Sequence, residues 1–489
     1  MASVGKAVSK DVKQQIRTSA LAFLSFLNKS VTPFHAVESC ESILRSAGFV
    51  ELFENQRLKV QPKGKFYIKK NETSIFAFAV GGAFNPTTTG YSIVVAHTDR
   101  FVLLFYFYIV FSPCLRVKPI SKRTSEQFLQ VGVSPYGGGV WRSWFDRDLS
   151  IAGQVIFKGA QSEILHKLID FGRPAIHLDS DRGKFEFNSE QHLRPILAQV
   201  PFDNSTKDEK KVDKDQIFSG ISIIGDHHDI LLKSIGELAG CEPEELLDLD
   251  LYLYDTQPAE EFISGARLDN LVGTYTSIMG LVQSLGDEQA FSTDQNIRLV
   301  ACFDNEEVGS VSAQGAASHF MEWLMRRIVA SPDDPNAFEC AIGRSYLVSA
   351  DQAHACHPNY ANKHEDCHKP TFNKGVVVKI NANQRYATSA VTHSIFKIIA
   401  ESAGIPIQKV VARSDLLCGS TVGPILSAKL GIQTIDVGCP QLAMHSIREL
   451  GDTSSIHYAT TLYSQFFNKL PSVLGSLKKH EPPTLMNVD

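Results

Sequence analysis

The sequence lacks the usual marks of secreted, membrane-spanning and disulfide-bonded proteins. Its nine cysteines include no Cys-x-x-Cys pair, and several lie inside apolar runs, which is typical of free buried thiols in a reducing compartment. The amino terminus, MASVGKAVSK, has no apolar signal-peptide core. The run FVLLFYFYIVF at 101–111 is too short to cross a bilayer as a helix. We therefore expect a cytoplasmic protein.

A strong surplus of one charge is also missing. The net charge is −5 at pH 7, and the basic residues are scattered along the chain. Proteins that bind nucleic acid or a membrane surface usually carry clustered positive charge. The sequence therefore predicts neither nucleic acid nor membrane as a partner. With 489 residues, 43% of them hydrophobic and 21% charged, the chain is long enough for two or three soluble domains.

Hydrophobic patterning predicts an α/β domain. Apolar residues recur at helical spacing over 12–27, and 74–80 and 91–96 resemble buried strands. Beyond residue 256, strands and helices alternate, which predicts a mostly parallel sheet with helices on both faces. There we expect helices at 270–285, 312–330, 387–403, 421–429 and 455–468, and strands at 297–303, 344–349, 409–413 and 433–437.

The stretch from 112 to 250 has a different texture. It contains Gly-rich turns, short strand-like runs, the charged segment 207–214 and a helix near 227–239. We interpret 112–250 as an inserted β-rich domain, so that the α/β domain consists of 1–99 and 251–489. Residues 100–111 stand apart as an anomalous hydrophobic insertion.

Acids and histidines follow the ends of the expected strands or open the next helix. These residues are His97, Asp269, Glu306, Glu307, Asp351 and His445. Because open α/β sheets collect their ligands at the carboxyl edge, we expect these side chains to converge on one crevice.

Two histidines and three carboxylates from this set form a donor set that suits zinc and can also take manganese or cobalt. A bridging Asp would hold two ions roughly 3.5–4 Å apart, an arrangement that clamps a nucleophilic water and the oxygen it attacks. One carboxylate should remain uncoordinated as a general base. The adjacent Glu306 and Glu307 would supply one ligand and one base.

Each residue has a structural alternative when taken alone. An Asp that opens a helix is usually a cap, which is the simpler interpretation of Asp269. His97 alone could be a hydrogen-bonded core histidine, and the Glu306–Glu307 pair alone could lie in a solvated loop. The coincidence of several such groups at one edge of one sheet favours the metal site.

Longer motifs carry a family resemblance. The stretches AHTD at 96–99, RLDN at 267–270, DNEEVGS at 304–310, SADQAHACHPNY at 349–360 and PQLAMHSIRE at 440–449 resemble the aspartyl aminopeptidases of the M18 family of zinc metallopeptidases. The likeness covers nearly the whole chain and includes GGGVW at 137–141 and WFDRD at 144–148 in the inserted domain.

The resemblance implies a co-catalytic di-zinc aminopeptidase that releases amino-terminal Asp or Glu from peptides. Glu306 would be the general base, which takes a proton from the attacking water and passes it to the leaving amine. The resemblance assigns one ion to His97, Asp269 and Asp351, and the second ion to Asp269, Glu307 and His445.

The resemblance also implies substrate contacts from His354, Lys379 and Tyr386, and one from His177 that reaches the site of a neighbouring subunit. A lysine is a suitable partner for an acidic side chain in a closed pocket. Without the resemblance, Lys379 would be a strand-edge lysine and His177 a structural histidine. The family assembles as a dodecamer through its inserted domain, so we expect a homo-oligomer whose closed shell admits short peptides.

The chain departs from the family pattern directly after Asp99. Twelve residues, 100–111, separate Asp99 from SPCLRVK at 112–118, and deleting them restores the family motif in frame. We interpret the insertion as translated intron sequence, against the alternative of a buried strand or hairpin. Its aromatic, uncharged composition is an aggregation hazard if exposed. Segments 166–178 and 257–261 are also shorter than in the family.

Two other functions stay open. The metal core alone does not select a side chain, so a di-zinc peptidase or deacylase of different specificity is the nearest alternative. An inactive oligomeric scaffold, its site disrupted by the 100–111 insertion, is the second. A separate structural zinc is less favoured, because no usual zinc spacing is present in the cluster of His354, Cys356, His357, His364, Cys367 and His368.

Overall fold

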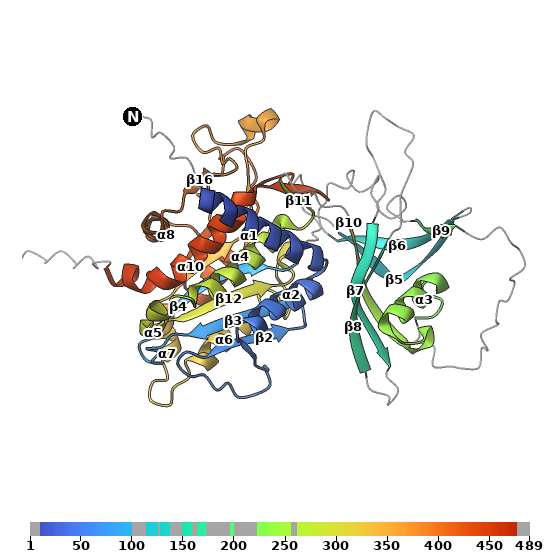
Figure 1. Cartoon of the computed structure of the whole chain (residues 1–489), viewed down its shortest axis with the longest axis horizontal. Coiled ribbons are helices and arrows are strands. Elements are labelled where there is room, and N and C mark those ends of the chain that lie inside the picture. The colour runs from blue at the N-terminus through green and yellow to red at the C-terminus, as the bar shows by residue number, and fades with distance from the viewer. Residues whose placement is uncertain are drawn as a thin grey trace, which may run out of the picture.

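The computed structural model describes residues 10–99, 114–125, 128–136, 149–158, 164–172, 196–199, 223–255 and 262–476. These residues form two lobes that lie side by side (Figure 1). The larger lobe holds a nine-stranded sheet between two layers of helices. The smaller lobe holds a six-stranded sheet and the helix α3 (Asp229–Ala239).

The nine-stranded sheet is mainly parallel, as the alternation of strands and helices predicts. Its strands are, in spatial order, β1 (Val50–Glu51), β2 (Lys65–Lys70), β3 (Ser74–Val80), β12 (Ile297–Phe303), β4 (Tyr91–His97), β13 (Tyr346–Ala350), β17 (Gln433–Gly438), β15 (Val376–Ile380) and β16 (Ile407–Val411). The four central strands β12, β4, β13 and β17 run in the same direction. Strands β3 and β15 flank them in the antiparallel sense.

Strand alternation explains why both faces of this sheet are buried. In β3, Ile75 and Ala77 pack into one hydrophobic core, whereas Phe76 and Phe78 pack into the other. Every residue of β3, β4 and β12 is buried, because a sheet covered on both faces needs continuous apolar runs. These three strands match the sequence prediction.

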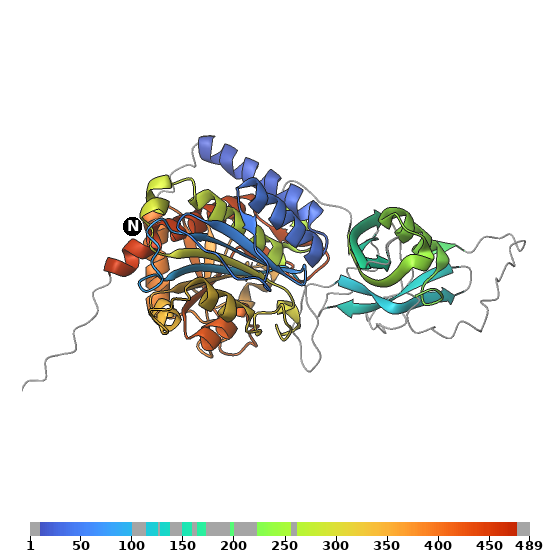
Figure 2. The same ribbon diagram turned by 90° about the horizontal axis from the view of Figure 1, so that it is seen from below.

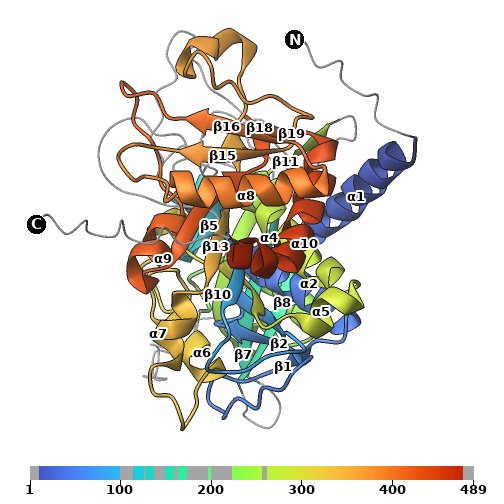
Figure 3. The ribbon, with the colours of Figure 1, turned by 90° about the vertical axis from the view of Figure 1, so that its left-hand side faces the viewer.

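Helices cover both faces of the sheet (Figures 2 and 3). One face packs against α1 (Lys10–Lys29), α2 (Pro33–Ser46), α4 (Leu268–Ser284), α5 (Glu288–Thr293), α8 (Ala390–Ala403) and α10 (Thr453–Ser476). The other packs against α6 (Phe320–Ile328), α7 (Ala337–Ile342) and α9 (Val422–Leu430). The predicted α/β architecture is confirmed. None of the helices in the described part of the chain is long and apolar enough to span a membrane.

One expected helix begins later than predicted. The interval 312–330 contains α6, which begins only at Phe320. The preceding residues are rich in Ser and Gly and form turns, in which the Ala317 N–H donates to the carbonyl oxygen of Ser310 at 3.1 Å. Ser hydroxyls compete for backbone hydrogen bonds, and Gly carries a high entropic cost in a helix. Both effects delay the start of the helix.

The smaller lobe is built on an antiparallel sheet. Its strands are, in spatial order, β8 (Ile164–Gly172), β7 (Leu149–Lys158), β10 (Leu246–Asp255), β5 (Cys114–Ser125), β6 (Phe128–Tyr136) and β9 (Ile196–Gln199). Leu231 and Ile235 of α3 share a hydrophobic core with Val117 and Val155 of the sheet. The lobe has the β-rich character expected of 112–250. The boundary at residue 250 stays a prediction, and β10 continues beyond it.

A third sheet combines segments that are distant in the sequence. Its four strands are β11 (Ile263–Gly265), β19 (Glu449–Gly451), β18 (Pro440–Leu442) and β14 (Ala353–His354). Strands of two or three residues give no periodic hydrophobic signal, so the sequence did not predict this sheet. It holds in place the segments that follow β13 and β17.

A buried arginine ties β12 to the helices on one face of the large sheet. Arg298 is fully buried, and its Nε lies 2.9 Å from Oδ2 of Asp294, just after α5. Its Nη1 donates to the carbonyl oxygen of Ser284 at the end of α4 and to Oδ1 of Asn468 in α10. Three helical segments therefore meet at one guanidinium group.

Asp294→Ala should lower the free energy of unfolding by about 3–5 kcal/mol, because it leaves Arg298 charged and without its carboxylate in the core. The control is Glu288→Ala in α5, which removes an exposed ion pair with Lys63 and should leave unfolding unchanged. Urea denaturation measures both changes. Equal losses of unfolding free energy in Asp294→Ala and Glu288→Ala would contradict a stabilising role of the pair formed by Arg298 and Asp294.

Candidate metal centre and substrate pocket

Parallel strands deliver four side chains to one edge of the large sheet. Strand β4 ends at His97, which lies in register with Phe303 at the end of β12. Glu306 and Glu307 follow β12 in the 3-10 helix η3 (Glu306–Val308), and Asp351 directly follows β13. The structure therefore places these side chains at the carboxyl edge that the sequence predicts.

Two further side chains reach the same place from irregular backbone. Asp269 lies near the start of α4 but has non-helical torsions, φ −87° and ψ 107°, and its peptide bond to Asn270 is cis. His445 follows β18 with φ 70°. Glu449 connects the two segments: Oε2 accepts the Asp269 N–H at 3.0 Å, and Oε1 accepts the His445 N–H at 2.6 Å. One buried carboxylate thus fixes both residues.

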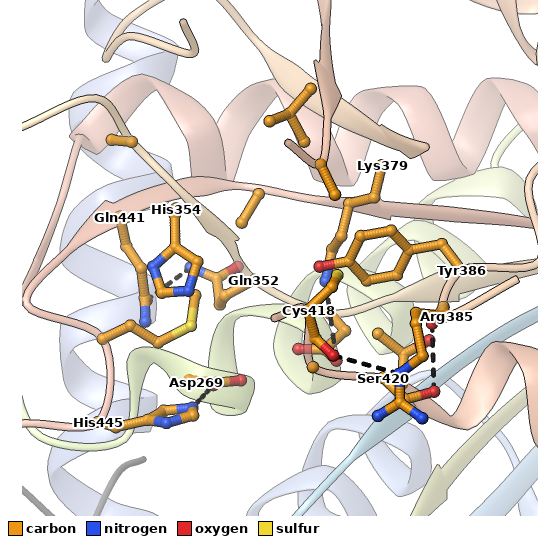
Figure 4. Close-up of a pocket in the computed structure, with 18 of the residues that line it drawn as sticks. Asp269, Gln352, His354, Lys379, Arg385, Tyr386, Cys418, Ser420, Gln441 and His445 are labelled. Atoms are coloured by element: carbon orange, nitrogen blue, oxygen red, sulfur yellow. Dashed lines mark hydrogen bonds and ion pairs between the residues drawn. The ribbon is translucent and has the colours of Figure 1, made fainter. Parts of the chain in front are cut away.

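Five of these side chains form two overlapping groups that could each hold a metal ion, and Figure 4 shows two of the five, Asp269 and His445. One group is His97, Asp269 and Asp351, and the other is Asp269, Glu307 and His445. His97 Nε2 lies 3.6 Å from Asp269 Oδ1 and 3.8 Å from Asp351 Oδ1. His445 Nε2 lies 2.7 Å from Asp269 Oδ2 and 4.0 Å from Glu307 Oε1. The Asp269 carboxylate therefore faces both histidines, with one oxygen toward each.

Asp99 positions the residues around these groups. Its Oδ1 accepts the Glu306 N–H at 3.0 Å, and its Oδ2 accepts the Glu307 N–H at 3.3 Å. The His97 Nδ1 lies 3.2 Å from the Asp99 carbonyl oxygen. Glu306 Oε2 lies 3.8 Å from His97 Nε2, and a third candidate group consists of His97, Glu306 and Glu307. Such outer contacts orient metal ligands.

The buried carboxylates carry more negative charge than their surroundings stabilise. Asp269 Oδ1 and Glu307 Oε1 are buried and have no hydrogen-bond partner among the residues that the structure describes. Burial raises the pKa of Glu306 to about 8 and lifts that of Glu307 well above its usual range, and neighbouring carboxylates add to both shifts. Divalent cations would supply the missing positive charge and would use the unpartnered oxygens. The donor set therefore fits a metal centre.

The pKa of Asp269 is shifted downward, opposite to those of Glu306 and Glu307. Burial alone would raise its pKa, but hydrogen bonds and charge from His445 and His97 together hold it below the usual range. Asp269 is thus readily ionised, and it lies in two of the three metal-capable groups.

A cavity of about 1250 Å³ opens beside these ligands. Lys379 of β15 lines it and is 3% exposed, with its Nζ 3.8 Å from Asp351 Oδ2 and 5.3 Å from the centre of the Tyr386 ring. His354 borders the same space (Figure 4). The His354 side chain is exposed to this space, and desolvation by the surrounding protein, together with the charges of His445 and Lys379, lowers its pKa to about 4. Lys379 is therefore a buried pocket residue, and the strand-edge interpretation is wrong.

Several side chains that line the cavity were missed by sequence reasoning. They are Gln352, Arg385, Cys418, Ser420, Gln441 and Arg448. Arg385 directly precedes Tyr386, so its place beside an expected substrate contact was the available signal. The loop at 412–421 has no periodic pattern, and nothing in its sequence indicates that it borders a cavity.

Some expected features lie outside the described residues. They are His177, the insertion at 100–111 and the motifs at 137–141 and 144–148. The Cys/His cluster at 354–368 is described, and none of its members belongs to the metal-capable groups found in the described part of the chain.

Comparisons with known proteins identify the family of this chain. The family described as Aminopeptidase I zinc metalloprotease (M18) matches residues 26–467. An aspartyl aminopeptidase of Caenorhabditis elegans is 53% identical over 485 residues, which cover 96% of this chain and 100% of the relative.

Two solved structures extend the comparison. The first, from the complex of Ape4 and Nbr1, is 35% identical with a TM-score of 0.87 and covers 97% of this chain and 90% of that chain. The second, the S. cerevisiae mApe1 dodecamer, is 27% identical with a TM-score of 0.77 and covers 93% of this chain and 98% of that chain. The chain therefore belongs to the M18 family of zinc metalloproteases.

Proposed function

We propose that this protein is a di-zinc aminopeptidase that releases amino-terminal Asp or Glu from short peptides. The observation that carries the proposal is the buried ammonium group of Lys379, which lies 3.8 Å from a carboxylate of the metal-capable cluster. A cation at that distance from the reacting centre can select an acidic first residue. The relative from Caenorhabditis elegans, named as an aspartyl aminopeptidase, supports the same specificity.

Two zinc ions are the proposed cofactors, with manganese or cobalt as possible substitutes. One ion would be held by His97, Asp269 and Asp351, and the other by Asp269, Glu307 and His445. This division uses Asp269 as the bridge and leaves Glu306 free. When bound, the ions lower the pKa of a water molecule and polarise the scissile carbonyl group.

Glu306 is the proposed general base. The Glu306 N–H is fixed by Asp99, and its carboxylate lies beside His97 in the mouth of the metal-capable cluster. In this position Glu306 can accept the proton of the attacking water and deliver it to the leaving amine. Glu307, which is more deeply buried and lies close to His445, is the better ligand.

The substrate side chain would bind in the cavity lined by Lys379, Tyr386 and His354. Lys379 would pair with the substrate carboxylate, because a charged hydrogen bond in a closed pocket is strong and selective. The His354 ring, neutral near pH 7, would act as a hydrogen-bond partner rather than as a second cation. His177 stays a proposed contact from a neighbouring subunit.

The protein is also proposed to assemble as a homo-oligomer, like the related structure described as a dodecamer. The smaller lobe leaves large apolar side chains exposed, and these would be covered by contacts between subunits. They include Ile120, Leu165, Ile230 and Leu238. A cytoplasmic location remains the proposal, because the described cysteines are free, as in a reducing compartment.

The direct test measures hydrolysis of Asp-, Glu-, Leu- and Lys-anilides by purified protein, together with its metal content. We expect about two metal ions per chain, a preference for Asp and Glu, and loss of activity with a chelator that added zinc restores. A preference for Leu or Lys would remove the role of Lys379 and favour a di-zinc hydrolase of other specificity. Folded, metal-free, inactive protein would indicate the scaffold.

Glu306→Gln should lower kcat by about 10²–10⁴-fold, because it removes the proton acceptor, while the two metal ions stay bound. The matched control is Glu322→Gln on the outer part of α6, where Glu322 pairs with Arg326, and it should keep full activity. If Glu306→Gln instead lost one of the ions, Glu306 would be a ligand, as in the third candidate group.

Glu449→Ala should weaken metal binding by about 10–100-fold, because Asp269 and His445 lose their common anchor. Competition with a chromophoric zinc chelator measures the affinity. Glu401→Ala, which removes an exposed carboxylate of α8, is the control and should bind zinc as the unmodified protein does. Unchanged zinc affinity in Glu449→Ala would show that Asp269 and His445 are fixed by other contacts.

Deletion of 100–111 should give a more soluble and more active protein than the full sequence, because the insertion begins next to Asp99, whose carboxylate holds η3. Size-exclusion chromatography and Asp-anilide hydrolysis, with and without chelator, compare the two forms. Peptide mapping of the natural protein should find Asp99 joined directly to Ser112. A natural peptide that contains 101–111 would contradict the intron interpretation.

A further inference from the structure

A buried acid lies in the large sheet behind the substrate pocket. Asp436, in the middle of β17, is fully buried. Its neighbours in the strand, Ile435 and Val437, point into the hydrophobic core on one face of the sheet, so the Asp436 side chain lies on the other face. A carboxylate in such a place is costly unless its oxygens are used. Asp436 takes no part in the metal-capable groups described above.

The carboxylate of Asp436 connects two loops, one at 381–389 before α8 and one at 412–421 before α9. Its Oδ1 accepts a hydrogen bond from the Thr421 hydroxyl at 2.5 Å, and its Oδ2 accepts one from the Ala387 N–H at 2.6 Å. The Asp436 N–H donates to the Thr388 hydroxyl at 2.9 Å. At Gly423 a Cβ atom would come within 2.4 Å of Asp436 Oδ1, so only glycine allows α9 to approach this closely.

The two loops form one wall of the pocket (Figure 4). Tyr386 directly precedes Ala387, and its ring faces the ammonium group of Lys379. The loops are also joined to each other, since Arg385 Nε donates to the Cys418 carbonyl oxygen at 3.2 Å and the Ser420 hydroxyl donates to the Arg385 carbonyl oxygen at 3.1 Å. Asp436 thus anchors the wall that covers Lys379.

Burial raises the pKa of Asp436, and the hydrogen bonds from Thr421 and Ala387 oppose that shift. The two loops therefore supply the donors that the buried carboxylate needs, and the carboxylate in turn holds the loops.

We propose that Asp436 is a positioning residue for specificity: it holds the Tyr386 wall over Lys379 and so sets the preference for an acidic first residue. This inference rests on the proposed function, because it concerns the selectivity of that same site. Asp436 would not touch the substrate itself. It would decide whether the pocket wall encloses Lys379.

The test compares kinetics of Asp436→Asn with those of the unmodified metal-loaded protein on Asp- and Leu-anilides. Asn keeps the shape of the side chain but removes its charge and one acceptor, so kcat/KM for the Asp substrate should fall about tenfold, mainly through KM. The kcat/KM for the Leu substrate should change little. The metal content should stay the same. The matched control is Asp294→Asn, another buried acid, which lies at the opposite edge of the sheet and should keep the Asp-to-Leu ratio.

A second pair of variants serves if Asp436→Asn does not fold. Thr421→Val removes the hydroxyl that donates to Asp436 and should lower the Asp-to-Leu ratio about threefold, since one neutral hydrogen bond is lost. Thr421→Ser keeps a hydroxyl and should restore the ratio. A structural role alone would lower activity on both substrates together and leave the ratio unchanged.

The inference is overturned if the Asp-to-Leu ratio of kcat/KM in Asp436→Asn equals that of the unmodified protein. If Asp436→Asn does not fold, the same ratio in Thr421→Val decides. This outcome differs from failure of the proposed function, in which the unmodified protein itself would show no preference for Asp or Glu. A lowered ratio with intact metal content supports the positioning role.

Discussion

The site depends on carboxylates that the fold buries beside one another. Asp269, Glu307 and Asp351 are withdrawn from water at the carboxyl edge of the sheet, and Asp269 and Glu307 each have an oxygen that forms no hydrogen bond with any described residue. Ionised groups in such a place lose hydration and repel one another, at a cost of several kcal/mol. Cations in the same space would offset that cost, so the donor set suits a metal centre. The surrounding fold serves to hold this arrangement.

The backbone positions the proposed metal ligands in two ways. His97, Glu307 and Asp351 follow parallel strands, so the register of the sheet alone brings them to one edge. Asp269 and His445 come from irregular backbone, which needs its own anchor, and the fully buried carboxylate of Glu449 provides it. The sheet therefore sets the positions of His97, Glu307 and Asp351. The hydrogen bonds to Glu449 set the positions of Asp269 and His445.

The same division decides what the sequence could predict. Residues after long apolar strands, such as His97 and Asp351, can be located because each strand has a clear pattern and direction. The short strands β18 and β19 give no such pattern, so the sequence placed His445 only as a histidine a few residues beyond the expected strand at 433–437, and the role of Glu449 was not foreseen. The buried state of Lys379 depends on β16 and β17, which lie on either side of β15, and a local sequence window does not contain them.

Catalysis and specificity share one set of charges. Asp351 belongs to a metal-capable group through Oδ1 and lies near Lys379 through Oδ2. A cation bound by Asp351 would weaken its hold on Lys379 and leave the ammonium group available to a substrate carboxylate. An acidic side chain would then enter a pocket that is most receptive when the proposed metal ions are in place. This coupling would let Lys379 act as the proposed selector without competing with the metal ions for Asp351.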